Sequence, residues 1–414
     1  FPLKVLQTTN GLPVEVIDSG LQNPNAGPDF FNAKLKIDGA LWVGNIEIHT
    51  HSSDWFRHGH DCDKAYDSVI LHVVSEADTE ITRTNGEQIP QLLLTCPENV
   101  QSHYHELCVA DHYPACYPIL ASLPKLTIHS WLTALQTERL EQKAQLIMQR
   151  LELCNNNWED AFFITLARNF GFGLNGDAFE TWAGLLPFRA MDKHRNDLFQ
   201  IEAFFYGLAG LLEETFLKKE QEDEYSLRLC KEFRYLQRKF EIGQGMDATL
   251  WRFLRLRPEN FPHIRLAQLA YLYQKGDKLF SRLLEAETLA DVRTLLDART
   301  SPYWENHYLF VRLSSQKEKV MGERSKDLII INTVVPFLYT YGLHKADERM
   351  CERAGRFLEE LKAESNHIIR SWSDAGLPVV SAADSQALIQ LQKEYCDKRK
   401  CLYCRFGYEY LKHT

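Results

Sequence analysis

The sequence lacks the features that mark several large classes of protein. In its 414 residues no apolar run reaches the roughly 18 residues that a membrane-spanning helix needs. It contains no Walker A, GxSxG or HExxH motif, which are common signatures of ATPases, serine hydrolases and zinc proteases. We therefore expect no membrane partner, and any catalytic residues must lie outside these motifs.

Cysteine is sparse. The ten cysteines are spread thinly along the chain and form no dense disulfide framework. This pattern favours reduced, mostly buried thiols and a cytoplasmic location. The exception is a C-terminal trio, Cys396, Cys401 and Cys404, of which the last two form a Cys-x-x-Cys pair that can chelate a metal ion.

Three interpretations of this trio remain open. It can hold structural zinc or an iron–sulfur cluster, it can be a set of reduced and packed cysteines, or it can contain a redox pair. For a metal site, a fourth ligand must come from elsewhere, and the candidates are Cys351, His367 and His413.

Positive charge is scarce in the N-terminal part of the chain. Residues 1–122 contain six Lys or Arg and 16 Asp or Glu, a net charge of −10, whereas the whole chain carries −9. Such an acidic region argues against a broad nucleic-acid-binding face there, because phosphate would be repelled. It suits a region that concentrates cations.

The hydrophobic pattern changes along the chain. Residues 1–95 read as β-rich, with hairpin turns predicted at Asp38–Gly39 and Asn85–Gly86. A proline-rich junction follows, and from Leu126 the apolar period is helical. We therefore expect an α+β N-terminal domain over 1–122, with a mixed sheet and hairpins, and a larger, mainly α-helical domain over 123–414.

The strand-like stretch GNIEIHTHSSDW places Glu47, His49 and His51 on one face. Asp29 precedes the first strand of the Asp38–Gly39 hairpin. In a hairpin the start of one strand lies beside the end of its partner, so Asp29, Glu47 and His49 are predicted to meet at one end of the sheet. Two carboxylates and an imidazole can bind Mg²⁺ or Mn²⁺.

Further histidines cluster nearby. His51, His58 and His60 follow His49 closely, and the HGHD stretch could add ligands to the same site. Imidazole-rich sites suit zinc. The alternative is a solvated strand face beside a polar loop. His72 lies within an apolar strand and is predicted to be a buried core histidine.

The N-terminal region resembles the PD-(D/E)XK nuclease superfamily. The matching residues are Pro28-Asp29 and Glu47-Ile48-His49. The resemblance implies a restriction-endonuclease-like mixed sheet, with Asp29, Glu47 and the Ile48 carbonyl as ligands of Mg²⁺ or Mn²⁺. His49 replaces the Lys of the pattern, and it could orient water, ligate the metal or mark an inactive site.

The chain as a whole resembles an uncharacterised bacterial family, defined only as a domain of unknown function. The stretches that carry this resemblance are GPDFFNA, GNIEIHTHSSDWFRHGHD, YDSVILHVV and CDKRKCLYCRFG. The resemblance covers most of the chain and implies no activity.

The C-terminal half contains one basic stretch. Residues 228–265 hold nine Lys or Arg against four acidic residues, interleaved with aromatic residues. They predict a nucleic-acid-binding surface that includes Arg252, Arg255, Arg257 and Arg265. The alternative is an amphipathic helix with a solvated basic side.

Three functions are consistent with these patterns. The first is a metal-dependent phosphodiesterase or nuclease that uses Asp29, Glu47 and His49. The second is a catalytically degenerate, nuclease-like binding or scaffold protein, which the missing Lys and the acidic charge favour. The third is a zinc-dependent hydrolase of a small substrate that uses His49, His51 and the HGH loop.

Overall fold

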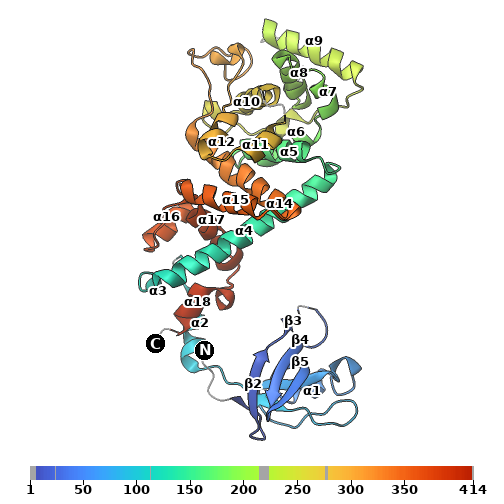
Figure 1. Ribbon diagram of the computed structural model, residues 1–414, viewed down its shortest axis with the longest axis vertical. Helices are drawn as coiled ribbons and strands as arrows, with labels where there is room; N and C mark the ends of the chain where they lie inside the picture. The colour runs from blue at the N-terminus through green and yellow to red at the C-terminus, as the bar shows by residue number, and fades with distance from the viewer. Residues whose placement is uncertain (1–5, 24, 112, 214–222, 276–277, 413–414) are drawn as a thin grey trace. The chain divides into compact units, whose positions relative to one another are not determined.

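The computed structural model describes the whole chain except residues 1–5, 24, 112, 214–222, 276–277 and 413–414 (Figure 1). It begins with a β-sheet and continues as a mainly helical region, which confirms the predicted α+β arrangement. Within the described residues, every helix is too short or too polar to cross a membrane.

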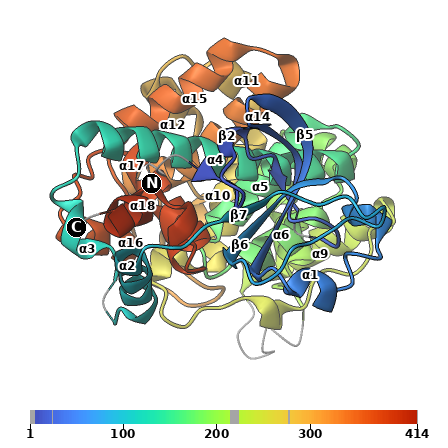
Figure 2. The ribbon, with the colours of Figure 1, turned by 90° about the horizontal axis from the view of Figure 1, so that it is seen from below.

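The N-terminal sheet is mixed. Its strand order is β1-β2-β4-β5-β6-β7, and β3 pairs with β4. The pairs β1–β2, β2–β4 and β4–β5 are antiparallel. The pairs β5–β6 and β6–β7 are parallel, and Figure 2 shows β6 and β7 side by side. The strands are β1 Leu6–Gln7, β2 Pro13–Asp18, β3 Leu21–Gln22, β4 Phe30–Ile37, β5 Ala40–His51, β6 Val69–Glu76 and β7 Gln91–Leu93.

The hairpin predicted at Asp38–Gly39 is present. Strands β4 and β5 pair up to Ile37 and Ala40, which leaves a two-residue turn. Both turn residues have positive φ, 49° for Asp38 and 77° for Gly39. This is the backbone that a type I′ turn needs, and its twist matches that of the two strands.

The second predicted hairpin is present but short, with Arg83 N–H donating to the Glu87 carbonyl at 2.9 Å and Ile89 N–H to the Ile81 carbonyl at 3.1 Å. Around Asn85–Gly86 the antiparallel pairing is reduced to one bridge between Thr82 and Gln88. Pro90 has no N–H group to extend the ladder, and the Thr82 carbonyl accepts the Trp55 indole N–H at 3.1 Å. The following strand, β7, instead pairs in parallel with β6.

The sheet nearly closes on itself. The N–H of Thr9 donates to the Gln91 carbonyl at 2.8 Å, which links the two ends of the strand order. Alternating side chains of β4, including Leu35, pack with Ile46 and Leu71 into an apolar core. Trp55, which follows β5, lies in a second buried cluster with Val69.

The larger part of the chain is helical. Phe162, Phe204 and Phe337 are fully buried in its core. Its α-helices are α4 Lys125–Leu153, α5 Trp158–Phe170, α6 Gly176–Gly184, α7 Phe188–Asp192, α8 Leu198–Leu208, α9 Glu224–Lys239, α10 Pro262–Lys275, α11 Leu279–Glu285, α12 Leu289–Leu295, α13 Glu323–Ile329, α14 Val335–Lys345, α15 Glu348–Glu360, α16 His367–Asp374 and α17 Ala382–Gln390. Two π-helical segments, η6 Ile330–Val334 and η7 Leu391–Cys396, continue α13 and α17.

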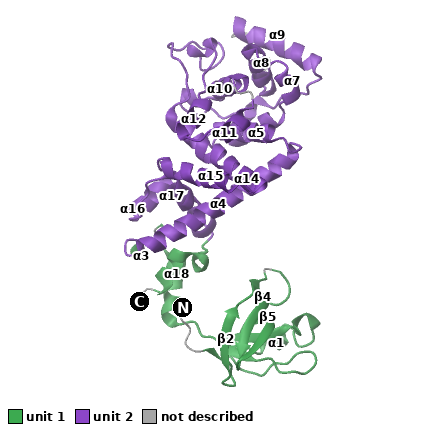
Figure 3. Ribbon diagram, in the orientation of Figure 1, with its two compact units in different colours: residues 1–119, 399–414 green, residues 120–398 purple. Residues whose placement is uncertain are grey.

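The chain divides into two compact units (Figure 3). One contains residues 1–119 and 399–414, and the other contains residues 120–398. In the first unit, helix α18, Arg405–Lys412, returns to helix α2, Glu98–Val109, where Tyr410 donates a hydrogen bond to Glu106 at 2.9 Å. The C-terminal segment therefore groups with the N-terminal residues. The short helix α3, Tyr117–Leu120, lies at the division.

Candidate metal centre

Strand β5 positions two of the predicted site residues. Glu47 and His49 point to the same face of the strand, because side chains alternate along it. Both side chains are almost fully buried, and Glu47 Oε1 lies 3.5 Å from His49 Nε2. Asp29 joins them through the backbone, since its N–H donates to Glu47 Oε2 at 3.0 Å and its carboxylate accepts the N–H of Ile48 at 2.9 Å.

A helix ending brings the HGH residues to the same place. The short helix α1, Asp54–Arg57, ends in a Schellman motif, in which His60 N–H donates to the Trp55 carbonyl and Gly59 N–H to that of Phe56. Gly59 takes the left-handed φ of 74° that this motif requires. The backbone reversal directs the side chains on either side of Gly59 towards β5.

Three imidazoles converge as a result. One ring nitrogen each from His49, His58 and His60 lies within 4.8 Å of the other two. His58 Nδ1 is 3.1 Å from His49 Nε2, and His60 Nε2 is 3.4 Å from Glu47 Oε1. Ligands of a tetrahedral zinc ion with bonds of about 2.1 Å are separated by about 3.4 Å. These residues therefore fit a transition-metal ion.

Two further residues hold this cluster in place. His72, on β6, is fully buried, and its Nε2 lies 2.9 Å from His49 Nδ1. The ring of Tyr66 stacks on His60 with centroids 3.7 Å apart. The sequence pattern identified His72 only as a core histidine. The parallel register that places it opposite Glu47 would have indicated its role.

Burial sets the charge of the cluster. It raises the pKa of Glu47 to about 7, and the nearby carboxylate of Asp29 adds to the rise. Burial, followed by the charges of His58 and His60, lowers the pKa of His49 to about 4. His49 is therefore neutral at neutral pH, which is the form of imidazole that binds metal ions.

The comparisons with known proteins give one match. A family model described as "Protein of unknown function (DUF2851)" matches residues 1–367. The chain belongs to the DUF2851 family. The predicted resemblance to an uncharacterised family is thereby confirmed, although the matched region ends before the CDKRKCLYCRFG stretch. No curated protein and no solved structure matches the chain.

His51 lies apart from the imidazole cluster of this DUF2851 protein. Its side chain is 44% exposed, with ring nitrogens 3.8 Å from Asp54 and 3.4 Å from Glu76. Although it shares a strand face with Glu47 and His49, it is not one of the three clustered imidazoles. It provides a matched control for them.

The C-terminal cysteines of the DUF2851 protein do not form a comparable cluster among the described residues. Cys396 ends η7 in the unit of residues 120–398, whereas Cys401 and Cys404 belong to the other unit. Burial and the nearby thiol of Cys108 raise the pKa of Cys401. A metal ion bound by the trio stays a prediction, and His413 lies outside the described residues.

The four predicted nucleic-acid-binding arginines differ in exposure. Arg252, Arg255 and Arg257 are exposed on an irregular segment, so the alternative prediction of an amphipathic helix is wrong there. It is confirmed for residues 228–239, whose basic side chains are exposed on helix α9. Arg265 is buried in α10, donates to Gln268 at 2.8 Å and lies 4.4 Å over the ring of Phe172. The guanidinium of Arg265 thus makes its contacts inside the DUF2851 protein.

Proposed function

We propose that this protein is a metal-dependent phosphodiesterase that acts on nucleic acids. The observation that carries the proposal is the convergence of His49, His58 and His60 beside the buried carboxylate of Glu47. Neutral imidazoles and a desolvated carboxylate are stabilised by a bound cation, which replaces the water that burial has removed.

The donor set favours a particular metal. Three imidazoles suit Zn²⁺ or Mn²⁺ better than Mg²⁺, which prefers oxygen ligands. His49, His58 and His60 would hold the ion, with Glu47 Oε1 beside two of them. When bound, such an ion supplies a Lewis acid that offsets the negative charge of a scissile phosphate.

The protein's own residues have separate roles in this proposal. His72 keeps the ring of His49 in one orientation through the contact at Nδ1. Glu47 is anchored at Oε2 by the Asp29 N–H, so Oε1 is left to face the imidazoles. With its raised pKa, Glu47 can accept a proton at neutral pH.

The substrate class rests on the resemblance to PD-(D/E)XK nucleases. Pro28-Asp29 stands just before β4, and Glu47-Ile48-His49 lies on the paired strand β5. In that superfamily the corresponding segments carry the metal-binding residues of phosphodiester hydrolysis. The imidazole that replaces Lys is the feature that sets this site apart.

A zinc-dependent hydrolase of a small substrate is the second candidate. The specific observation in its favour is that three of the side chains around the site are imidazoles, the ligand set of many zinc hydrolases. The two candidates share the metal and differ in substrate.

One experiment separates these possibilities. The full chain, stripped with EDTA and reloaded with Zn²⁺, Mn²⁺ or Mg²⁺, is assayed on labelled single- and double-stranded DNA, RNA and p-nitrophenyl acetate. We expect nucleic-acid cleavage with Zn²⁺ or Mn²⁺ that Glu47→Gln and His49→Ala reduce by about 10²-fold or more. His51→Ala is the matched control and keeps the activity.

The other outcomes decide between the alternatives. Hydrolysis of the ester alone would favour the small-substrate hydrolase. Nucleic-acid binding without cleavage, unaffected by Glu47→Gln and by metal, would favour the degenerate binding protein predicted as an alternative.

A further inference from the structure

A second candidate site lies in the helical unit and includes no residue of the proposed metal centre. It is a cavity of about 500 Å³, formed by α4, α5, α6 and the π-helical segment η6. This volume is typical of small-molecule sites. Its charged lining residues are Lys143, Arg150, Arg168 and Glu180, so the lining carries a net charge of +2.

Lys143 is the central cation. Its Nζ donates to Asn332 Oδ1 at 3.1 Å and to Gln386 Oε1 at 3.0 Å, both of which are neutral amide oxygens. Burial, together with the charge of the nearby Arg139, lowers the pKa of Lys143 to about 7. Among the described residues no carboxylate forms an ion pair with this ammonium group, although the charge of the nearby Glu364 favours its charged form. An anion in the cavity would stabilise the charged form further.

Two guanidinium groups are fixed on the wall of the cavity. Arg150 lies on the same face of α4 as Lys143, seven residues later, and donates to Thr165 at 2.6 Å. Arg168 on α5 and Arg150 both pair with the single carboxylate of Glu180. Arg168 also pairs with the exposed carboxylate of Asp177 at 2.7 Å, so the charged groups at the cavity, counted with Asp177, carry a net charge of +1. Glu180 holds both guanidinium groups in defined positions.

The π-helical segment contributes the remaining polar wall. Within η6, Asn332 presents its amide oxygen to Lys143, and its backbone carbonyl accepts a hydrogen bond from Asn169 at 3.1 Å. In an α-helical ladder that carbonyl would have no donor, because Pro336, four residues later, lacks an N–H group. π-Helical turns inside α-helices occur frequently at functional sites, because they redirect side chains and free backbone groups.

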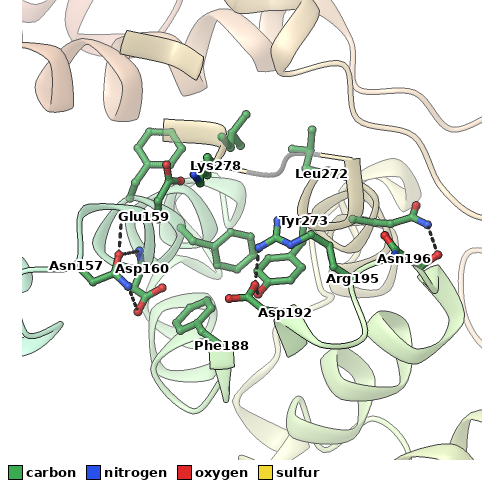
Figure 4. Close-up of a pocket in the computed structure, with 14 residues that line it drawn as sticks. Asn157, Glu159, Asp160, Phe188, Asp192, Arg195, Asn196, Leu272, Tyr273 and Lys278 are labelled. Carbon is green, nitrogen blue, oxygen red and sulfur yellow. Dashed lines mark hydrogen bonds and ion pairs between the residues drawn. The ribbon is translucent and has the colours of Figure 1, made fainter. Parts of the chain in front are cut away.

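Another cavity of this unit has the opposite character. It has a volume of about 550 Å³, and its charged lining residues are three carboxylates and two cations (Figure 4). There Arg195 pairs with Asp192 at 2.5 Å and lies 4.3 Å over the ring of Tyr273. Because carboxylates outnumber cations in its lining, this cavity serves as an internal comparison.

We propose that the cavity around Lys143, Arg150 and Arg168 binds a small molecule that carries a phosphoryl group. A phosphoryl group has several acceptor oxygens, which match the N–H donors of one ammonium and two guanidinium groups around one cavity. The proposal is independent of the metal centre, because it uses none of its residues.

The test is direct binding of inorganic phosphate and phenyl phosphate to the full chain, by isothermal titration calorimetry at constant ionic strength. We expect saturable binding at one site per chain. Lys143→Gln and Arg168→Gln each weaken it by about tenfold or more, since each removes a charge-assisted hydrogen bond. Two controls keep the affinity: Lys125→Gln, exposed on the same helix α4, and Lys278→Gln, exposed in the comparison cavity.

Three outcomes overturn the proposal. They are no saturable binding of either compound, equal loss of affinity in the two controls, and benzoate binding as tightly as phenyl phosphate, which would assign the cavity to carboxylates. If Lys143→Gln fails to fold, Arg168→Gln still decides the matter, because that side chain is 41% exposed at the cavity and its removal disturbs little packing.

Discussion

His72 illustrates how much depends on a single side chain behind the proposed ligands. It touches none of the clustered nitrogens except through His49, whose Nδ1 it meets at 2.9 Å. Partners of this kind orient a metal-binding imidazole and select its tautomer. A residue that the sequence predicts as part of the core thus becomes a positioning residue for the site.

His72→Phe should therefore weaken zinc binding by about 10- to 100-fold. The fold is expected to be kept, because the ring packs against Trp55 and its Nδ1 has no hydrogen-bond partner among the described residues. His72→Gln, which can still hydrogen-bond to His49, should recover part of the affinity. Competition with a chromophoric chelator measures both variants. Unchanged affinity in His72→Phe would show that the contact has no orienting role, and His51→Ala serves as the matched control.

A second residue-scale prediction concerns the fully buried Glu202 on α8. Tyr225 and Ser301 both donate hydrogen bonds to its carboxylate. Burial raises its pKa from 4.5 to about 7, so the folded protein binds this proton more tightly than the unfolded chain. The stabilising contribution is complete below pH 4.5 and is lost as the pH rises to about 7.

Glu202→Gln, which imitates the protonated acid, should remove this dependence. Between pH 4.5 and 8 the free energy of unfolding of the wild type should fall by about 3 kcal/mol relative to the variant. Urea titrations of both proteins at several pH values measure the difference. Parallel pH profiles would mean that Glu202 has no raised pKa in the folded protein.

At the scale of elements, the close approach of β5 and β6 depends on Gly44. A Cβ atom at this position would lie 2.5 Å from a methyl group of Ile70 and 2.6 Å from the Ser68 carbonyl oxygen. The same pair of strands carries His49 and His72, so their spacing affects the site as well as the sheet.

Gly44→Ala should force the two strands apart, at a cost of about 1–3 kcal/mol. We expect faster hydrogen exchange of the amides in β5 and β6, together with weaker zinc binding. Gly243→Ala is the control, because no atom lies within 4 Å of the position that its new methyl group would take and its φ is not left-handed. Equal exchange in the two variants would contradict the prediction.

At the scale of the whole molecule, the chain ends in the unit where it begins. Helix α18 meets α2 through the Tyr410–Glu106 hydrogen bond and through the rings of His103 and Tyr410, whose centroids are 5.9 Å apart. Gly407 lets this segment fold tightly, since a Cβ there would lie 2.1 Å from the Cys401 carbonyl oxygen.

A chain that ends at Lys398 should consequently expose α2. We expect its amides to exchange at least about tenfold faster, whereas β5 and β6 keep their protection and zinc affinity is unchanged. Hydrogen exchange with mass spectrometry follows all three segments in one experiment. Full protection of α2 in the shortened chain would show that α18 does not stabilise it.

The sequence by itself determined the features that depend on neighbouring residues. The change of apolar period predicted the α+β order. The Asp38–Gly39 pair predicted a hairpin, because Asp-Gly readily adopts the positive φ angles that a type I′ turn needs. Alternation along β5 placed Glu47 and His49 on one face, and counting from the turn placed Asp29 beside them.

Only the tertiary structure decided the features that depend on distant pairing. Parallel pairing brings His72 behind His49, the Schellman turn directs His58 and His60 to the same point, and packing buries Arg265. The local pattern did not anticipate that β7 pairs with β6 or that residues 399–414 group with α2. Such contacts join segments that are far apart in sequence, and burial of apolar surface across the whole chain selects them rather than the propensity of any one segment.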